Sequence, residues 1–329
     1  MLMLQCTIQG RCTPPGFPGM TSPGKVVKLI LPLAAFALFM GKAQAETVKV
    51  ADGVYAILGT GGEISRDNGG RTANVAFIVG SRGIAVVDTG ASYRQGEEII
   101  AAVANISSLP IVVAILTHPG QEAVFGAAAF RARGISVLAH RSSAELIVSR
   151  CEMCLQNLRS VLGENFMAET RVVTPDRLID ASQMLASIGR PLRLIAPAWS
   201  SAPGAIAVFD EATSTLITGS LVSIKRIPDM RDADVKGWLK ALTELRALRC
   251  RYLIPGYGPI GTCAEVKDFM RYFTELENRV AALMRQGIGL AGLQSRCDLP
   301  EFAQWDQYGE LHPQNANRTY LRIEKSHFQ

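Results

Sequence analysis

The chain is poor in charge, and its small charge surplus is confined to one end. Charged residues make up 19% of the 329 positions, and the formal net charge is +5. Residues 1–45 hold four basic residues and no acidic one, which leaves a net charge of +1 for the rest of the chain. A protein that binds nucleic acid carries a clustered basic face. The composition therefore argues against a nucleic-acid partner.

The sequence also lacks internal linkers and repeats. After residue 46 there is no linker, no low-complexity segment and no short tandem repeat. The missing repeat excludes a solenoid. Because 48% of the residues are apolar, the chain can bury a sizeable core. We expect an N-terminal extension and signal peptide over residues 1–45 and one domain over residues 46–329.

No apolar run is long enough to cross a bilayer comfortably. The longest one before the domain, residues 29–40, has about a dozen residues, whereas a spanning helix needs about 20. It follows Lys25 and Lys28 and precedes an Ala-Gln-Ala pattern at residues 43–45. These features predict a signal peptide, export to the periplasm and no membrane segment after cleavage. Met20 lies at a normal distance from the cleavage site, so we expect translation to start there. An uncleaved anchor is the alternative.

Five of the seven cysteines follow the predicted cleavage site. They are Cys151, Cys154, Cys250, Cys263 and Cys297. In an oxidising compartment an odd number leaves at least one thiol free or paired between chains. Cys151 and Cys154 form a C-x-x-C pattern about two turns inside a predicted helix, and not at its N-terminus, where a thiol pKa is lowered. A packed or disulfide-linked structural pair is the main interpretation, and a redox pair or a metal contribution stays open.

The apolar pattern predicts alternating β-rich and helical segments. We expect strands over residues 48–58, 73–80, 83–90, 111–116, 134–140, 193–197, 205–209, 215–218 and 251–254. We expect helices over residues 93–107, 142–162, 234–248 and 263–285, and a helix opening at residues 126–130. A capping box that begins at Ser142 starts the second helix. Two successive β-rich halves, each finished by helices, predict an α/β protein with an αββα four-layer sandwich.

The turn after residues 111–116 carries the main functional pattern. A hairpin that ends in Val-Asp-Thr-Gly, a strand that ends in Thr-His and a turn before a helix resemble the metallo-β-lactamase fold. That family has the zinc motif Thr-His-x-His-x-Asp-His-x-x-Gly. Thr117, His118 and Gly126 match it. Gly120, Glu122 and Ala123 stand where the family has its second histidine, its aspartate and its third histidine.

At three later positions a metal ligand of the family is also replaced. Ser201 stands at the place of the histidine in the family's Ala-His-Thr-x-Gly-Asp loop, and Ser220 at the place of the bridging aspartate. Tyr257 replaces the histidine of Pro-Gly-His-Gly-Pro. Zinc needs about four N, O or S donors. A serine hydroxyl is a weak donor, and tyrosine loses its proton only near a pKa of about 10. Because the neighbouring glycines and prolines are kept, we interpret this as a dismantled metal site on a retained scaffold.

His118 itself has two interpretations. With Glu122 it could be one arm of a weak metal site, or it could hydrogen-bond across the former site, which we favour because two donors leave zinc mostly hydrated. Asp88 is expected to be structural and to accept backbone hydrogen bonds. His140, at the end of a strand, is expected to be structural as well.

A finer resemblance rests on looser patterns. The Arg-Cys-x-x-Cys-Leu segment, a Val-Val-Thr-Pro-Asp stretch and the tail at residues 311–324 resemble the quinoprotein relay system zinc metallohydrolases. Those are exported proteins associated with dehydrogenases that use pyrroloquinoline quinone (PQQ). The resemblance covers about residues 46–325 and implies zinc as the cofactor of the family. The replaced ligands lead us to expect no cofactor here, and a binding or accessory role beside a periplasmic quinoprotein dehydrogenase system.

Two other functions stay open. In the first, the protein is an active metal-dependent hydrolase with a rebuilt site, in which Tyr257, Cys263 or His140 assists His118 and Glu122. In the second, it is a thiol redox partner that uses the C-x-x-C pair.

Overall fold

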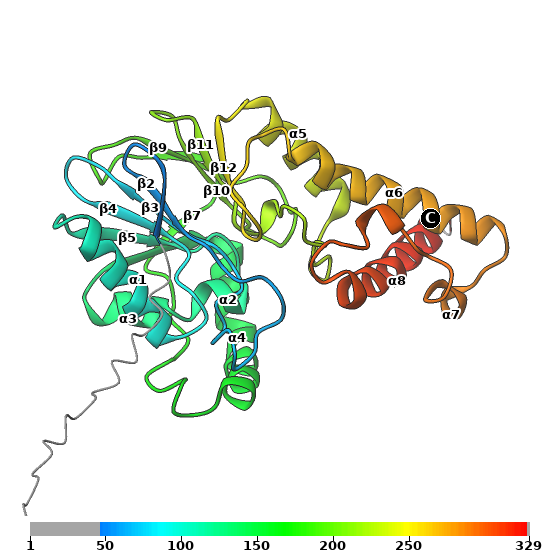
Figure 1. Cartoon of the computed structure of the whole chain (residues 1–329), viewed down its shortest axis with the longest axis horizontal. Helices are drawn as coiled ribbons and strands as arrows, with labels where there is room; N and C mark the ends of the chain where they lie inside the picture. Colours follow the sequence, from blue (N-terminus) through cyan, green and yellow to red (C-terminus); the bar gives the residue numbers. More distant parts are fainter. Residues whose placement is uncertain (1–46, 328–329) are drawn as a thin grey trace, which may run out of the picture. The chain divides into compact units, whose positions relative to one another are not determined.

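The computed structural model describes residues 47–327 and contains two β-sheets with helices on their outer faces (Figure 1). The predicted export signal lies outside the described residues. The strands are β1 Thr47–Ala51, β2 Val54–Ile57, β3 Val75–Val79, β4 Ile84–Val87, β5 Ile111–Ile115, β6 Ser136–His140, β7 Arg177–Ile179, β8 Gln183–Leu185, β9 Leu192–Ile195, β10 Ala207–Asp210, β11 Thr215–Ile217 and β12 Tyr252–Ile254. The helices are α1 Tyr93–Ile106, α2 Gln121–Val124, α3 Ala127–Ala132, α4 Arg141–Leu162, α5 Val235–Ala247, α6 Val266–Arg285, α7 Leu290–Leu293 and α8 Tyr308–His327, with 3-10 turns η1 Gly219–Leu221 and η2 Pro300–Phe302.

The larger sheet follows the order of the chain. Its seven strands lie in the order β1 to β7, antiparallel from β1 to β4 and parallel from β4 to β7. The smaller sheet has the order β12-β11-β10-β9-β8, and only β11 and β12 are parallel. Parallel neighbours need a crossover connection, which α1, α3 and α4 provide in the larger sheet. The crossovers place these helices on one face of that sheet.

Alternation along the strands divides the core into three layers of side chains. In β3, Phe77 packs with residues of α1, α3 and α4, whereas its neighbour Ile78 packs between the two sheets. In β10, Val208 lies between the sheets and Phe209 packs with residues of α5 and α6 on the other side. Successive side chains of a strand point to opposite faces, so each strand serves two layers. The result is the predicted αββα sandwich.

Several element boundaries differ from the prediction. The strand expected over residues 48–58 is a hairpin, β1 and β2, which turns at Gly53 with a φ of 68°. The cap of α4 is not Ser142, because the side chain of His140 accepts the backbone N–H of Ser142 at 3.1 Å. Strands β7 and β8 were not predicted. The helix expected to close the chain, α6, is followed by α7 and α8.

Helix α8 is joined to the rest of the protein by a buried polar cluster, which was not predicted. His312 Nε2 lies 2.6 Å from the carbonyl oxygen of Cys297, which can only accept, so this nitrogen carries the proton. His312 Nδ1 then accepts from the Tyr272 hydroxyl at 3.1 Å. Asn315 donates to that hydroxyl and to the carbonyl oxygen of Pro228. The tail pattern of the finer resemblance thus supplies side chains that dock α8.

The cysteines of the described part fall into two groups. Cys250 and Cys263 form a disulfide, whereas Cys151, Cys154 and Cys297 are free. Cys151 and Cys154 are not linked to each other, so of the structural interpretations only the packed pair fits. Between residues 47 and 327 there is no helix of the length and hydropathy that crossing a membrane requires.

Candidate functional site

Four loops meet at one edge of the sandwich, where the predicted site residues lie. Each follows the end of a strand: Asp88 follows β4, Thr117 follows β5, Gly219 follows β11 and Gly256 follows β12. A Cβ added to Gly219 would lie 2.0 Å from the Thr117 hydroxyl oxygen, and one added to Gly256 would lie 2.3 Å from the Gly219 carbonyl oxygen. Only glycine permits such close approach of loops. These glycines therefore bring the loops of both sheets together.

The centre of the edge is a contact between His118 and Glu122. His118 Nε2 lies 3.0 Å from Glu122 Oε1, and their side chains are 7% and 13% exposed. The same Glu122 oxygen accepts the Tyr257 hydroxyl. Residues 118, 122 and 257 come from the turn after β5, from α2 and from the loop after β12. The fold thus brings together three of the seven predicted positions in one hydrogen-bonded group.

The hydrogen bonds define where the protons are. The Thr117 hydroxyl donates its single hydrogen to Asp88, with distances of 3.0 and 2.8 Å to the two carboxylate oxygens. Its oxygen lies 2.8 Å from His118 Nδ1, which must therefore donate to it when Asp88 is ionised. Glu122 Oε1 accepts from His118 Nε2 on the other side. With Asp88 ionised, this arrangement places a proton on both nitrogens of the ring, which then forms a buried ion pair with Glu122.

The pKa shifts agree with this ion pair. Burial acts to lower the pKa of His118, but the hydrogen bond and charge of Glu122 raise it above its ordinary value. Burial acts to raise the pKa of Glu122, but His118 and the Tyr257 hydroxyl lower it to about 2. Burial and the charge of Glu122 raise the pKa of Tyr257 well above 10. Tyrosinate, the form that binds metal, is therefore disfavoured.

Asp88 fixes the loop behind His118. It is a non-glycine residue with a φ of 64°, a conformation that costs free energy and needs support. Its carboxylate gives that support by accepting the backbone N–H of Thr117 at 2.8 Å as well as the Thr117 hydroxyl. Burial raises the Asp88 pKa to about 6, although His118 and Thr117 act in the opposite direction. Asp88 thus orients the Thr117–His118 segment from beneath.

Gly120 and Ala123 contribute no side-chain donor. A Cβ on Gly120 would lie 2.4 Å from both His118 Nε2 and Glu122 Oε1, so any larger residue must displace that contact. Ala123 is fully buried and packs in the layer beneath the larger sheet. Its carbonyl oxygen accepts the Thr89 hydroxyl. The turn from residue 118 to 123 is therefore closed around the ion pair.

The two predicted serines meet each other. Ser201 Oγ and Ser220 Oγ are 2.9 Å apart, and the backbone of the loop between β9 and β10 bonds to the strand end at Thr117. Ser220 directly follows Gly219, which packs on Thr117. The serines thus belong to the same edge, and one hydroxyl donates to the other.

Arg226 and Asp306 form an outer wall that the sequence did not indicate. The Arg226 guanidinium lies over the Tyr257 ring, 4.3 Å from its centroid, and bonds to the Asp306 carboxylate. Asp306 also accepts the backbone N–H of Gly62 at 3.0 Å. These residues come from three distant segments, and no local motif contains them. They hold the tyrosine ring in the orientation that reaches Glu122.

Two residues suggested as helpers of a rebuilt site are engaged elsewhere. Cys263 is in the disulfide with Cys250, so it offers no thiolate. His140 uses its Nδ1 to cap α4. The Cys263 part of the hydrolase alternative is wrong, because that sulfur is in the disulfide. Help from His140 or Tyr257 stays a prediction.

The donor set at this edge does not fit a zinc pair. A metal-bound histidine needs a free nitrogen lone pair, and both nitrogens of His118 are protonated in the ion pair. Of the other six positions, Glu122 offers a carboxylate that already accepts from His118 and Tyr257. The rest are a glycine, an alanine, two serines and a protonated tyrosine. Among residues 47–327, no group of three or more His, Cys, Asp or Glu side chains is placed to hold a metal ion.

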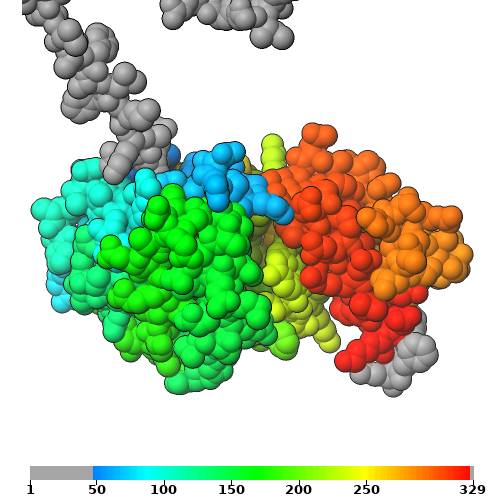
Figure 2. Space-filling model, turned by 90° about the horizontal axis from the view of Figure 1, so that it is seen from below, coloured from blue at the N-terminus to red at the C-terminus, as the bar shows by residue number. Residues whose placement is uncertain are grey.

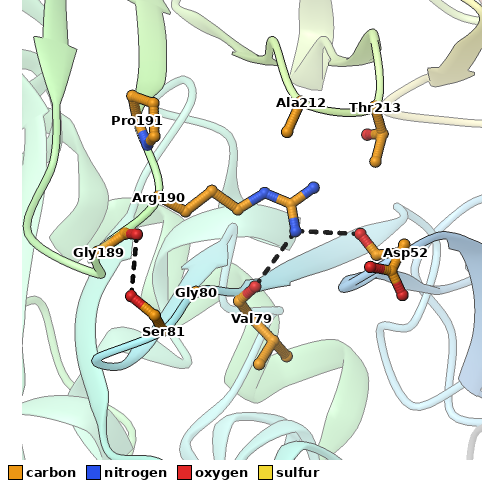
Figure 3. Close-up of a pocket in the computed structure, with 9 residues that line it drawn as sticks. All are labelled: Asp52, Val79, Gly80, Ser81, Gly189, Arg190, Pro191, Ala212 and Thr213. Carbon is orange, nitrogen blue, oxygen red and sulfur yellow. Dashed lines mark hydrogen bonds between the residues drawn. The ribbon is translucent and has the colours of Figure 1, made fainter.

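A surface hollow lies at the opposite strand ends. Its volume is about 430 Å³, and turns of both sheets form its walls (Figure 3). Arg190 crosses it, but its guanidinium is saturated by Asp210 and by the carbonyl oxygens of Asp52 and Val79. The other charged side chain of the hollow is Asp52, which is almost fully exposed and, among the described residues, pairs only with Lys49 at 3.5 Å. We therefore keep the His118 edge as the candidate site.

Comparison with known proteins places this edge in a family context. The family described as "Metallo-beta-lactamase superfamily" matches residues 68–257. No curated protein matches the chain. A metallo-beta-lactamase from Pontibacter korlensis has a TM-score of 0.56 and 19% identity, over 69% of this chain and 97% of that one. One from Erythrobacter litoralis has a TM-score of 0.54 and 19% identity, over 70% and 96%.

A larger enzyme also shares the fold. The stereoselective inverting sec-alkylsulfatase from Pseudomonas sp. has a TM-score of 0.64 and 19% identity to this chain. The match covers 84% of this chain but only 50% of the sulfatase, so the chain spans about half the length of that protein. At such low identity these likenesses show the fold alone.

Proposed function

The chain belongs to the metallo-beta-lactamase superfamily, and from this membership we propose that it is a degenerate, non-hydrolytic member with a binding or accessory role. The zinc-binding edge of an ancestor has become a closed network of side chains that bond to one another. A protein of this kind would bind a partner through the surface at this edge of the sandwich. It would supply no metal-activated water.

One observation carries the proposal. His118, the residue at the first metal-ligand position of the family motif, uses both ring nitrogens inside the protein. Its partner Glu122 accepts two hydrogen bonds on one oxygen, and the pair is nearly inaccessible to solvent. Zinc would have to break a buried ion pair and remove a proton from the ring before it gained one ligand. The neighbouring serines add only weak donors.

The place of action and the partner are also proposals. The charge, apolar run and Ala-Gln-Ala pattern before residue 46 support export to the periplasm. The resemblance to the quinoprotein relay system proteins supports a role beside PQQ-dependent dehydrogenases. We propose such a dehydrogenase system as the partner.

Metal content and hydrolysis test the proposal together. The protein, purified after expression of the full chain, is equilibrated with excess zinc, desalted and analysed for elements, and is then assayed on lactam, ester and thioester substrates. We expect well under one zinc per chain and hydrolysis at the rate of the buffer. Two zinc ions per chain with zinc-dependent turnover would overturn the proposal.

The active hydrolase remains a second candidate because of one observation. A buried histidine–carboxylate pair is also the arrangement of a general base and its orienting group. If this pair catalyses hydrolysis, His118→Ala abolishes turnover, whereas Ser149→Ala on the exposed side of α4 does not. An unchanged rate in His118→Ala removes the candidate. The thiol alternative does not involve this pair and is a separate proposal.

A further inference from the structure

The C-x-x-C pair lies in the middle of α4, at the surface of the protein. Figure 2 shows the green part of the chain, which includes α4, on an open face of the molecule. Cys151 is 1% exposed and packs in the layer beneath the larger sheet, with Leu155 and Leu158. Cys154 lies at the edge of the same layer and is partly exposed. One turn of helix thus presents one sulfur to solvent and keeps the other behind it.

The surroundings give the two thiols opposite character. The hydrogen bond from Cys151 is the largest influence on Cys154, and with the charge of Arg231 it lowers the Cys154 pKa to about 6. The same bond, together with burial, raises the pKa of Cys151. Cys154 Sγ also lies 3.6 Å from the carbonyl oxygen of Arg150. When it carries its proton, Cys154 donates to that carbonyl oxygen, and its lowered pKa favours loss of the proton. A partly exposed, acidic thiol therefore lies one helical turn from a buried thiol that keeps its proton.

The spacing permits a bond between them at a small structural cost. Residues three apart on a helix have Cβ atoms about 5–6 Å apart. A disulfide needs about 3.5–4.5 Å between its Cβ atoms, so the helix must close locally by about 1.5 Å. A bond formed under such strain is more reducible than a relaxed one. This geometry suits a disulfide that forms and breaks repeatedly.

We propose that Cys154 is a reactive thiol that hydroperoxides oxidise, and that Cys151 resolves it as a reversible disulfide inside α4. In the first step the Cys154 sulfur attacks a peroxide oxygen. The S–O bond forms, the O–O bond breaks, and the departing alkoxide or hydroxide takes a proton from water. The product is a sulfenic acid, and the peroxide has been reduced.

In the second step the Cys151 sulfur attacks the Cys154 sulfur. The S–S bond forms, the S–O bond breaks, and the leaving hydroxide takes the proton of the Cys151 thiol as water. A small dithiol reductant returns both residues to thiols through a mixed disulfide. Neither step uses the His118 edge, so this inference stands apart from the proposed function.

The chain contains its own control. Cys297 is free but 4% exposed, and burial raises its pKa to about 11. It shares the fold and the solution conditions with Cys154 and differs in exposure and in thiolate content. We expect iodoacetamide to alkylate Cys154 more than about tenfold faster than Cys297 at neutral pH. Equal, slow alkylation of the two residues would overturn the proposal.

Peptide mass mapping after treatment with hydrogen peroxide follows the bond itself. Cleavage at Arg150 and Arg159 releases both cysteines in one peptide, residues 151–159. We expect this peptide to become lighter by two hydrogens and to return to its first mass after dithiothreitol. Oxidation of Met153 adds an oxygen and is distinguished by its mass. Peroxide treatment that changes only Met153 would contradict the proposal.

Two variants separate the roles of the thiols. In Cys151→Ser the sulfenic acid cannot be resolved, but the hydroxyl can still donate to Cys154, so dimedone should trap the sulfenic acid on Cys154. In Cys154→Ser the peptide should no longer react with peroxide at its remaining cysteine. Cys154 is partly exposed, so we expect Cys154→Ser to have the melting temperature of the natural protein. This variant therefore tests the proposal even if a substitution at the buried Cys151 impairs folding. Dimedone labelling of Cys151 in the Cys154→Ser variant would show that Cys151 is the residue that peroxide oxidises, and this result would overturn the proposal.

Discussion

Two buried histidines in this protein have pKa values shifted in opposite directions, because their hydrogen-bond partners differ. His118 and His312 are 6% and 3% exposed, so burial alone does not distinguish them. His118 lies beside the carboxylate of Glu122, which raises its pKa. His312 contacts a carbonyl oxygen and a tyrosine hydroxyl, and burial lowers its pKa. The charge of the neighbour, and not the depth, decides whether a buried imidazole is cationic.

The two sites therefore respond to pH in opposite directions. A raised His118 pKa means that the stability it contributes is present below 6.5 and is lost as the pH rises through the folded pKa. A lowered His312 pKa means that its contribution is present above 6.5 and is lost as the pH falls below that value. One histidine holds the sandwich edge through charge, and the other docks α8 through neutral hydrogen bonds.

The largest effect is expected from removing the negative partner of His118. Glu122→Gln keeps the shape of the side chain but leaves a buried imidazolium without its counter-charge. Breaking a buried pair in this way costs about 3–5 kcal/mol of the free energy of unfolding. Urea titration measures the loss, with Glu145→Gln on the exposed face of α4 as the control. A loss equal to that of the control would show that no ion pair exists.

A smaller effect is expected at the neutral cluster. His312→Leu removes the donor to the Cys297 carbonyl oxygen and the acceptor of the Tyr272 hydroxyl. Unpaired buried polar groups cost about 1–3 kcal/mol. The same urea titration measures this loss, and His312→Gln should recover part of it by restoring a hydrogen bond. If leucine proves neutral, the cluster does not dock α8.

The two variants should also differ in how their loss of stability depends on pH. The Glu122 pKa of about 2 lies below its ordinary value of 4.5, so its contribution is complete above pH 4.5 and is lost as the pH falls towards 2. The stability difference between the natural protein and Glu122→Gln should therefore shrink across that window. The stability difference between the natural protein and His312→Leu should also shrink on acidification, but this decrease should already begin just below pH 6.5. Parallel curves for both variants would contradict the assigned charges.

The smallest effect is expected at the outer wall. Arg226→Lys keeps the charge near Asp306 but loses the planar guanidinium over Tyr257. A cation–π contact contributes about 0.5–1 kcal/mol at a partly exposed site. Urea titration should detect a loss of that size. Arg246→Lys on α5, whose guanidinium has no ion-pair partner among the described residues, is the control.

The fold was largely predictable because its signals are local. Short apolar, β-branched runs such as β3 and β4, and the amphipathic faces of α1 and α5, follow directly from the local sequence pattern. The order of motifs then placed His118, Glu122 and Tyr257 near one another. Boundaries failed where a side chain overrode the local pattern: His140 caps α4 in place of Ser142, and Pro313 lies inside α8, a position where proline argues against a helix.

The arrangement of the site was less predictable than its location. Motif positions do not say which atoms bond, so the Ser201–Ser220 contact and the double use of Glu122 Oε1 needed coordinates. Arg226 and Asp306 are 80 residues apart, and only the fold places them together. The protonation of His118 follows from this three-dimensional set of donors and acceptors.

Nitrogen-15 NMR of the histidine rings at neutral pH tests the central claim most directly. We expect both nitrogens of His118 to carry protons, His312 to carry a proton on Nε2 alone, and excess zinc to change neither. The His118→Ala and His312→Leu variants assign the signals. An unprotonated His118 nitrogen whose signal shifts when zinc is added would contradict the account, because that ring would then be free to bind metal.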